Sequence, residues 1–232
     1  MPTMLITGAN RGLGLEWVRQ YAADGWHVHA SCRYPDEAEE LQDLADGNTR
    51  VQVHRLDVTH PQEIAVVARE LKDEPLDLLI NNAGVYFERW GQDPVGTIDY
   101  DAWEATFQVN TLGAMRVTEA FLDHVSRSGQ RLVVAISSHM GSIADITDGR
   151  NYAYRSSKAA LNAAMRGLSH ELAGRKVGLL LLHPGWVNTR MGGPDAPHTP
   201  SESVAGMRAL VEHFEPSRAG RFFKFDGTEL PW

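Results

Sequence analysis

The sequence has a single cysteine, Cys32, and no long hydrophobic run. One cysteine excludes an internal disulfide, as is typical of proteins in a reducing compartment. The longest apolar run, Leu179–Leu182, is far too short to span a bilayer. The opening MPTMLITGAN lacks the basic start and apolar core of a signal peptide. We therefore expect a cytoplasmic protein without a membrane partner.

Positive charge is also scarce. Lys and Arg number 22 against 30 Asp and Glu, a net charge of -8, and no cluster of basic residues offsets this locally. Such a chain is a poor match for a nucleic-acid backbone. Repeats, low-complexity tracts and linkers are absent, so residues 1–232 are predicted to form a single domain with one core.

Short apolar runs alternate with longer helical patterns along the chain. Several runs, such as LDLLI, LVVAI and VGLLLL, are continuously apolar, which is typical of parallel strands covered on both faces. Strict alternation predicts an α/β fold: a Rossmann fold with a doubly wound, seven-stranded parallel sheet and helices on both faces. Strands are predicted at Met4–Thr7, His27–Cys32, Val51–Leu56, Leu76–Ile80, Arg131–Ser137, Val177–His183 and Arg221–Phe225.

Helices are predicted between these strands. Thr199, Pro200 and Glu202 form a helix-start pattern, with a cap, a first-turn proline and an acid at the third position. The Gly- and Pro-rich piece just before it, around residues 190–200, is interpreted as a mobile substrate loop. The other predicted helices are Leu13–Asp24, Glu37–Ala45, Gln62–Lys72, Asp101–Arg127 and Tyr154–Ala173.

The first strand runs into a glycine-rich turn, TGANRGLG, at which a helix begins. Glycines let backbone N–H groups approach a pyrophosphate, and the helix N-terminus adds partial positive charge. The spacing differs from the general G-x-G-x-x-G fingerprint. The turn is interpreted as a cofactor phosphate site, although an ordinary glycine-rich turn has the same composition.

Tyr154 and Lys158 lie four residues apart at the start of a predicted helix, so both side chains share one face. An ammonium near a phenol lowers the phenol pKa, which makes Tyr154 a candidate general acid or base. Tyr152 has no such partner, because Ser156 stands four residues on. Ser138 follows the strand LVVAI, where ligands bind in open α/β sheets. Taken singly, Tyr154 could be a helix cap, Lys158 a solvated side chain and Ser138 an ordinary strand end.

Together, these motifs resemble the short-chain dehydrogenase/reductase family over nearly the whole chain. TGANRGLG is similar to its cofactor loop, NNAG at residues 81–84 to its fourth-strand motif, and PGWVNT at residues 184–189 to its PG motif. SSHMGSIAD, YAYRSSKAALN, HPGWVNTRMGG and the C-terminal GRFFKFDGTELPW look most like sniffer-like and C-signal-like carbonyl reductases. The gap of 16 residues between Ser138 and Tyr154 is wider than is usual in the family, and indicates a longer loop over the site.

The resemblance implies an NADP(H)-dependent oxidoreductase that acts on a small-molecule carbonyl or alcohol substrate. It implies that NADPH gives hydride to the carbonyl carbon, Tyr154 gives a proton to its oxygen and Ser138 orients it. Lys158 would lower the tyrosine pKa and hold the nicotinamide ribose, and Asn110 would position a water next to Lys158. The implied cofactor-binding residues are Gly8, Asn10, Arg11, Gly12, Leu13, Gly14, Arg33, Asp57, Val58, Asn82, Ala83, Gly84, Tyr154, Lys158, Pro184, Gly185, Val187 and Thr189.

Charge predicts which nicotinamide cofactor is bound. An acid at the end of the second strand selects NAD in this fold, and that position here is Cys32. Arg33 follows it, and Arg11 stands in the phosphate loop. Arginine suits a 2′-phosphate because its planar fork binds bidentately. We expect NADP(H), while pairing of Arg33 with Asp36 or Glu37 remains an alternative.

Other features carry weaker expectations. His27 and His29 share a strand face without a third ligand, so no metal site is expected. Leu161, Met165 and Leu168 recur on one side of a long helix and fit either a core or a homodimer or homotetramer interface. An NADP(H)-binding regulator with vestigial catalysis is the alternative function. Four residues could line an apolar substrate pocket: Trp90, Met140, Trp186 and Met191.

Overall fold

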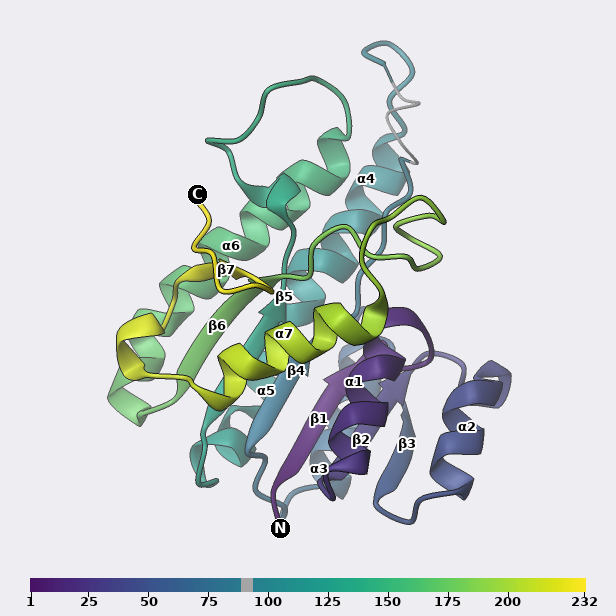
Figure 1. Cartoon of the computed structure of the whole chain (residues 1–232), viewed down its shortest axis with the longest axis vertical. Helices are drawn as coiled ribbons and strands as arrows, with labels where there is room; N and C mark the ends of the chain where they lie inside the picture. The colour runs from purple at the N-terminus through teal and green to yellow at the C-terminus, as the bar shows by residue number, and fades with distance from the viewer. Residues whose placement is uncertain (89–93) are drawn as a thin grey trace.

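The computed structural model of the protein describes residues 1–88 and 94–232. Its sheet has seven strands in the order β3-β2-β1-β4-β5-β6-β7, and every neighbouring pair is parallel (Figure 1). This confirms the predicted doubly wound sheet. The strands are β1 Thr3–Thr7, β2 His27–Cys32, β3 Val51–Arg55, β4 Leu78–Asn81, β5 Leu132–Ile136, β6 Gly178–His183 and β7 Phe222–Lys224.

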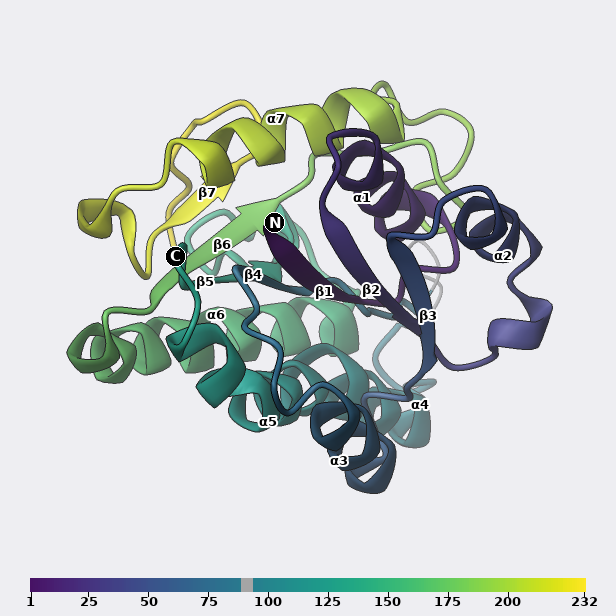
Figure 2. The same cartoon turned by 90° about the horizontal axis from the view of Figure 1, so that it is seen from below.

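Helices cover both faces of the sheet (Figure 2). Helices α1, α2 and α7 lie on one face, and α3, α5 and α6 lie on the other. The main helices are α1 Gly12–Ala23, α2 Glu39–Asp46, α3 Pro61–Glu70, α4 Tyr100–Phe107, α5 Ala114–Ser126, α6 Tyr152–Leu172 and α7 Pro200–Glu212. Single 3₁₀ turns lie at η1 Pro35–Glu37, η3 His139–Gly141, η4 Ala173–Arg175 and η5 Pro216–Arg218. No helix in the described residues is long and apolar enough to cross a bilayer.

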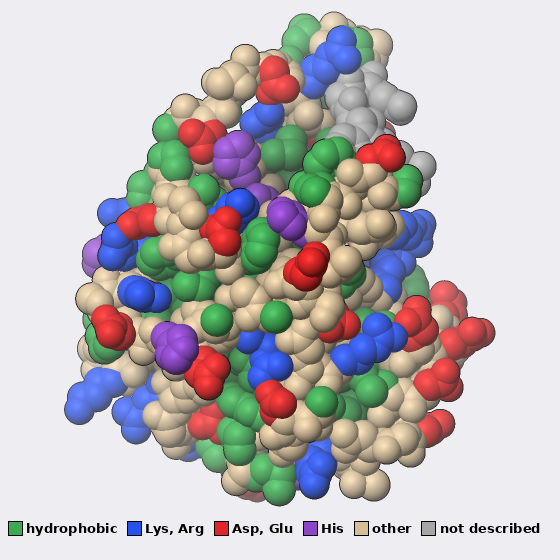
Figure 3. Space-filling model, in the orientation of Figure 1, with side chains coloured by type: hydrophobic (Ala, Val, Ile, Leu, Met, Phe, Trp, Pro, Cys, Tyr) green, Lys and Arg blue, Asp and Glu red, His purple; other side chains and the backbone are tan. Residues whose placement is uncertain are grey.

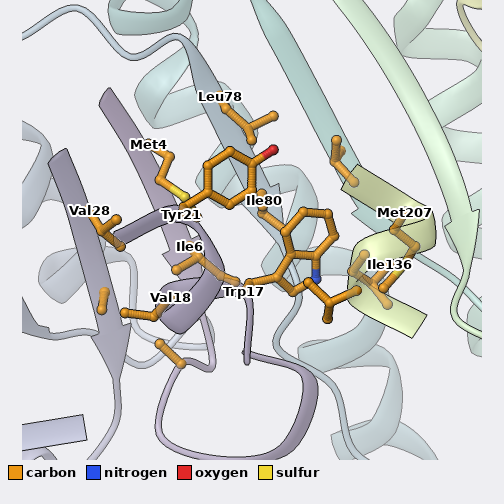
Figure 4. Close-up of a cluster of buried hydrophobic side chains, with 14 of the residues drawn as sticks. Met4, Ile6, Trp17, Val18, Tyr21, Val28, Leu78, Ile80, Ile136 and Met207 are labelled. Carbon is orange, nitrogen blue, oxygen red and sulfur yellow. The ribbon is translucent and has the colours of Figure 1, made fainter. Parts of the chain in front are cut away.

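Alternating strand residues divide the core into two layers. Met4 and Ile6 of β1 pack under α1 and α7, whereas Leu5 between them packs on the opposite face. Trp17 and Tyr21 of α1 fill the first layer, as Figure 4 shows, with their rings stacked 5.7 Å apart. The continuously apolar strands therefore bury side chains on both faces, as their sequences predict.

The stripe on α6 belongs to the second layer. Leu161 and Met165 are fully buried, and Leu168 packs against the same cluster. This settles the role of the stripe as core, so it gives no support to a subunit interface. The homodimer or homotetramer stays a prediction.

The predicted single helix Asp101–Arg127 is wrong in one respect. A π-helical segment, η2 Gln108–Gly113, separates α4 from α5. Gly113 lies in this segment against Val58, where an added Cβ would come 2.6 Å from Cγ2 of the valine. Wider π turns of this kind are frequent at functional sites, and this one carries Asn110.

The helix start at Thr199 is confirmed. The Thr199 hydroxyl accepts a hydrogen bond from the Glu202 N–H, and the Glu202 carboxylate accepts one from the Thr199 N–H. The loop before it is closed at its base, since Asn188 donates to His198 and His198 to Trp186 through their backbones. These contacts hold the predicted substrate loop beside the carboxyl end of β6.

Candidate active site

The glycine-rich turn lies between β1 and α1, as predicted. Gly8 and Gly12 have φ of 68° and 55°, in the left-handed region that favours glycine. A Cβ at Gly14 would lie 2.1 Å from the Gly8 carbonyl oxygen, so only glycine lets the helix start this close to the turn. The first N–H groups of α1 therefore lie at the turn without partners inside the helix. Such an arrangement binds phosphate groups.

The NNAG segment supports this turn from β4. Asn82 donates through Nδ2 to the carbonyl oxygens of Thr7 and Gly8, at 2.9 and 3.1 Å. The Thr7 hydroxyl accepts from the N–H groups of Asn82 and Ala83, both at 3.1 Å. Gly84 follows, and a Cβ placed there would lie 3.4 Å from Oδ1 of Asn110 and 3.7 Å from Nζ of Lys158. These bonds fix the turn to the strand that leads into the site.

Three arginines gather at the other end of the turn. Burial lowers the pKa of Arg11, and the positive charges of Arg190 and Arg33 lower it further. In the described residues none of the three has an ion-pair partner, so Arg33 does not pair with Asp36 or Glu37. The Arg33 guanidinium lies over the Tyr34 ring, 5.7 Å from its centroid.

A small cavity lies beside these cations. It has a volume of about 260 Å³, and Arg33, Tyr34 and Arg55 line it together with the η1 turn. Cys32 lies next to it, and burial raises the pKa of its thiol, so the residue is a packed side chain without acidic character. Its lining thus combines the cations Arg33 and Arg55 with the carboxylates Asp36 and Glu37, and the cation Arg33 directly follows the position where NAD-selective sites have an acid.

Asp57 and Val58 follow β3 at the same edge of the sheet. One carboxylate oxygen of Asp57 accepts from the N–H and the hydroxyl of Thr59, at 2.8 and 2.7 Å. Its own N–H donates to Glu63 of α3 at 2.7 Å. The Asp57 side chain therefore shapes the turn after β3, and Val58 is buried against η2.

The proposed catalytic side chains come together at the carboxyl ends of β5 and β6 and the start of α6. The Ser138 side chain lies beside the Tyr154 hydroxyl, close enough to stabilise its phenolate. Lys158 is buried one turn further along α6, with Nζ 5.9 Å from the centroid of the Tyr154 ring. Its ammonium donates to the Ile136 carbonyl oxygen at 2.8 Å.

Burial dominates the electrostatics of these groups. It raises the pKa of Tyr154 to about 12, while the Ser138 hydrogen bond lowers it and nearby Tyr86 raises it. It also lowers the pKa of Lys158 to about 8. The tyrosine pKa is therefore raised and not lowered as expected, because desolvation of the phenolate is the largest influence on it.

Asn110 is buried beside the catalytic helix. Its Oδ1 accepts from the Val85 N–H at 2.8 Å, and its Nδ2 donates to the Val85 carbonyl oxygen and the Ser157 hydroxyl, both at 3.0 Å. Both amide hydrogens and one acceptor position of Oδ1 are therefore used in joining the segment after β4 to α6. These hydrogen bonds give Asn110 a structural role, because they connect Val85 with Ser157 of α6.

The PG segment leaves β6 toward the phosphate turn. Gly185 has φ of 83°, and a Cβ there would come 2.8 Å from the Phe225 ring. Val187 is buried two residues on, and the Thr189 methyl would lie 3.4 Å from a Cβ placed at Gly12. The PG segment therefore brings Thr189 next to the glycine-rich turn, and the cofactor contacts of Pro184, Gly185, Val187 and Thr189 stay a prediction.

Sequence reasoning missed three residues near the site. Tyr86 places its ring 4.6 Å from that of Tyr154, Glu88 hydrogen-bonds the start of α6, and Arg190 joins the cations around Arg11. None is signalled locally, because each contact depends on how a loop returns to the site. Of the candidate pocket residues, Met140 lies in the η3 turn after β5, Trp186 and Met191 lie in the loop after β6, and Trp90 lies outside the described residues.

His29 of β2 forms hydrogen bonds that lie away from the candidate site. His29 is buried and hydrogen-bonds with His54 at 3.0 Å through Nδ1 and with Glu74 at 2.9 Å through Nε2. Both ring nitrogens are thus engaged away from the site. Across the residues that the structure describes, no group of three His, Cys, Asp or Glu side chains could hold a metal ion.

Comparison with known proteins agrees with this geometry. The chain is 48% identical to the C-signal of Myxococcus xanthus over 158 residues, which is 68% of this chain and 93% of that protein. Its structure matches the carbonyl reductase Sniffer of D. melanogaster with a TM-score of 0.93 and 32% identity over all of both chains. An NADPH-bound carbonyl reductase from chicken fatty liver also matches with a TM-score of 0.93 and 32% identity, over 100% of this chain and 99% of that one.

The family assignment rests on the greater part of the chain. The model of the short chain dehydrogenase family matches residues 2–199, from β1 to the cap of α7. That range includes the glycine-rich turn, the NNAG segment, the Ser138, Tyr154 and Lys158 group and the PG segment. The protein therefore belongs to the short-chain dehydrogenase/reductase family of oxidoreductases.

Proposed function

We propose that this protein reduces the carbonyl group of an apolar or aromatic aldehyde or ketone with NADPH. The observation that carries the proposal is the placement of Ser138 beside the Tyr154 hydroxyl, with buried Lys158 next along the same helix face. A carbonyl oxygen placed at these two hydroxyls would accept a hydrogen bond and then a proton. Bound NADPH supplies the hydride for the carbonyl carbon.

Tyr154 has the protonation state that a proton donor needs. With its pKa raised to about 12 by burial, the phenol is protonated at neutral pH. Lys158, whose pKa burial lowers to about 8, is still mostly cationic there and favours the phenolate left after proton transfer. Ser138 holds the carbonyl oxygen within reach of the phenol proton, as general acid catalysis requires.

The residues of the chain fit a dinucleotide. The turn from Gly8 to Gly14 provides backbone N–H groups and a helix N-terminus for a pyrophosphate. Arg11 and Arg33 supply positive charge at the adenosine end, and Arg190 adds a third cation. The carbonyl reductase from chicken fatty liver carries NADPH, which supports the same cofactor for this chain.

The proposed substrate class follows from the side chains around the site. Segments that reach it each carry an exposed apolar residue: Phe87 next to Tyr86, Ile143 after the η3 turn, and Trp186 and Met191 after β6. Apolar side chains of this kind suit an aromatic or aliphatic carbonyl.

The test is turnover of a panel of aliphatic, aromatic and charged carbonyls, measured by loss of NADPH absorbance. We expect the aromatic and apolar members to be reduced with the highest kcat/KM. If NADPH binds tightly but no carbonyl or alcohol is turned over, the oxidoreductase proposal fails and the regulatory alternative replaces it. The intact arrangement of Ser138, Tyr154, Lys158 and Asn110 favours the enzyme, because a sensor has no need of all four.

A further inference from the structure

The catalytic helix α6 begins without a cap from its own chain segment. Its first residue follows Asn151, which has φ of 56° and whose side chain makes no capping hydrogen bond. The Asn151 Oδ1 instead accepts a hydrogen bond from the Tyr86 hydroxyl at 2.6 Å. The first N–H groups of a helix need partners from elsewhere, and this need is acute where they are buried.

Glu88 supplies those partners from a distant segment. Its two carboxylate oxygens accept from the N–H of Ala153 at 3.0 Å and from the N–H of Tyr154 at 2.8 Å. The Glu88 side chain is buried, with 8% of its surface exposed. A carboxylate at this end of a helix is also favoured by the helix dipole.

Glu88 ends a short segment that connects the whole site. We call Val85–Glu88 the strap. Val85 hydrogen-bonds in both directions with Asn110, and Tyr86 packs its ring 4.6 Å from that of Tyr154. The strap therefore joins the π-helical segment and the start of α6 to the end of β4.

We infer that Glu88 is a positioning residue for the proton donor. It does not touch the reacting atoms. Glu88 accepts a hydrogen bond from the backbone N–H of Tyr154, and this bond fixes the position of the phenol relative to Ser138. Without the carboxylate, two buried N–H groups lose their acceptors, the first turn of α6 loosens and the two hydroxyls move apart. Misplacement of about 1 Å in a catalytic group can cost about 10²-fold in rate.

A test that does not depend on activity is amide hydrogen exchange at the start of α6. In Glu88→Ala, the Ala153 and Tyr154 amides should exchange faster by about 10-fold to 10²-fold, since each buried hydrogen bond to a carboxylate is lost. In Glu88→Gln, one amide oxygen can still accept, so protection should fall at only one of the two amides. Formate added to Glu88→Ala should restore protection, and chloride at the same ionic strength should not.

The matched control is Glu202→Gln. It removes the capping carboxylate of α7, a helix that carries none of the proposed catalytic residues. It should loosen the start of α7 and leave exchange in α6 as in the wild type. Circular dichroism and thermal unfolding should be measured for all the variants, to establish that each is folded at the assay temperature.

The kinetic test rests on the proposed function. In Glu88→Ala, hydride transfer in a single turnover should slow by about 10²-fold, with an intermediate loss in Glu88→Gln, an unchanged Kd for NADPH and recovery with formate. Glu202→Gln should react at the wild-type rate. Faster exchange with unchanged hydride transfer, or slow hydride transfer with unchanged exchange, would overturn the inference. If the wild type reduces no carbonyl, the proposed function fails, while the exchange result still decides whether Glu88 caps α6.

Discussion

Replacement of Arg33 with Asp should reverse the preference of this protein for NADPH. Arg33 lies on the rim of the small cavity after β2, and no carboxylate in the described residues forms an ion pair with it. Its guanidinium is therefore available to a 2′-phosphate, and Cys32 before it offers no acid to bind a ribose hydroxyl. The substitution removes this cation and places an anion in the same cavity.

The size of the effect follows from two contributions. Loss of hydrogen bonds between a guanidinium and a phosphate costs about 1.5–3 kcal/mol. A new carboxylate near the phosphate adds about 1 kcal/mol of repulsion, because Arg33 is exposed and water screens the charges. The total of about 2.5–4 kcal/mol corresponds to about 10²–10³-fold weaker NADPH binding. NADH lacks the 2′-phosphate, so its affinity should change little or rise.

The assay is a fluorescence titration of the wild type and the variant with NADPH and with NADH. Arg50→Asp is the matched control, since Arg50 is exposed, undergoes the same charge change and lies at the amino end of β3, opposite the site. The selectivity of the wild type should also shrink as salt is raised, because exposed charges are screened. Equal wild-type affinities for the two cofactors, or equal losses in Arg33→Asp, would refute this reasoning.

Three further predictions concern the scaffold. Gly14→Ala should abolish NADPH binding in a titration, because the new Cβ would lie 2.1 Å from the Gly8 carbonyl oxygen; wild-type affinity would contradict this. Burial lowers the pKa of His183 from 6.5 to about 3, so its contribution to stability is complete above pH 6.5 and is lost as the pH falls toward 3. The melting temperature of His183→Phe should therefore fall less than that of the wild type over this range, and parallel curves would oppose the assignment. Light scattering at micromolar concentration should give the mass of a homodimer or homotetramer, and a monomer mass would disprove it.

The sheet could be predicted from the sequence because its signals are local. Continuous apolar runs mark β4, β5 and β6, and the glycine-rich turn and the Thr199 cap mark helix starts. The π-helical segment η2 was missed, because the pattern that predicts Asp101–Arg127 does not distinguish a π turn from the α-helix around it. Its cause lies in contacts made by Asn110 and Gly113 with segments far away in the sequence.

The candidate site was also predictable only in part, namely where its residues follow local sequence patterns. Ser138, Tyr154 and Lys158 were found because each lies at the end of a predicted strand or on one face of a helix. Glu88 was missed because its contact with Tyr154 spans 66 residues and follows a segment without a motif. The electrostatic expectation for Tyr154 was wrong for a related reason: the sequence gives the ammonium but not the burial, and burial dominates its pKa.

Carbonyl reduction as proposed depends on Tyr154 as the proton donor. The most direct measurement is single-turnover oxidation of NADPH by the best carbonyl of the panel, in the wild type, Tyr154→Phe and Tyr152→Phe. Tyr152 is the matched control, because it begins the same helix but stacks on Trp103, away from Ser138. We expect Tyr154→Phe to bind NADPH normally and to react about 10²–10⁴-fold more slowly, and Tyr152→Phe to react as the wild type does. Near-normal hydride transfer in Tyr154→Phe would contradict this role of Tyr154.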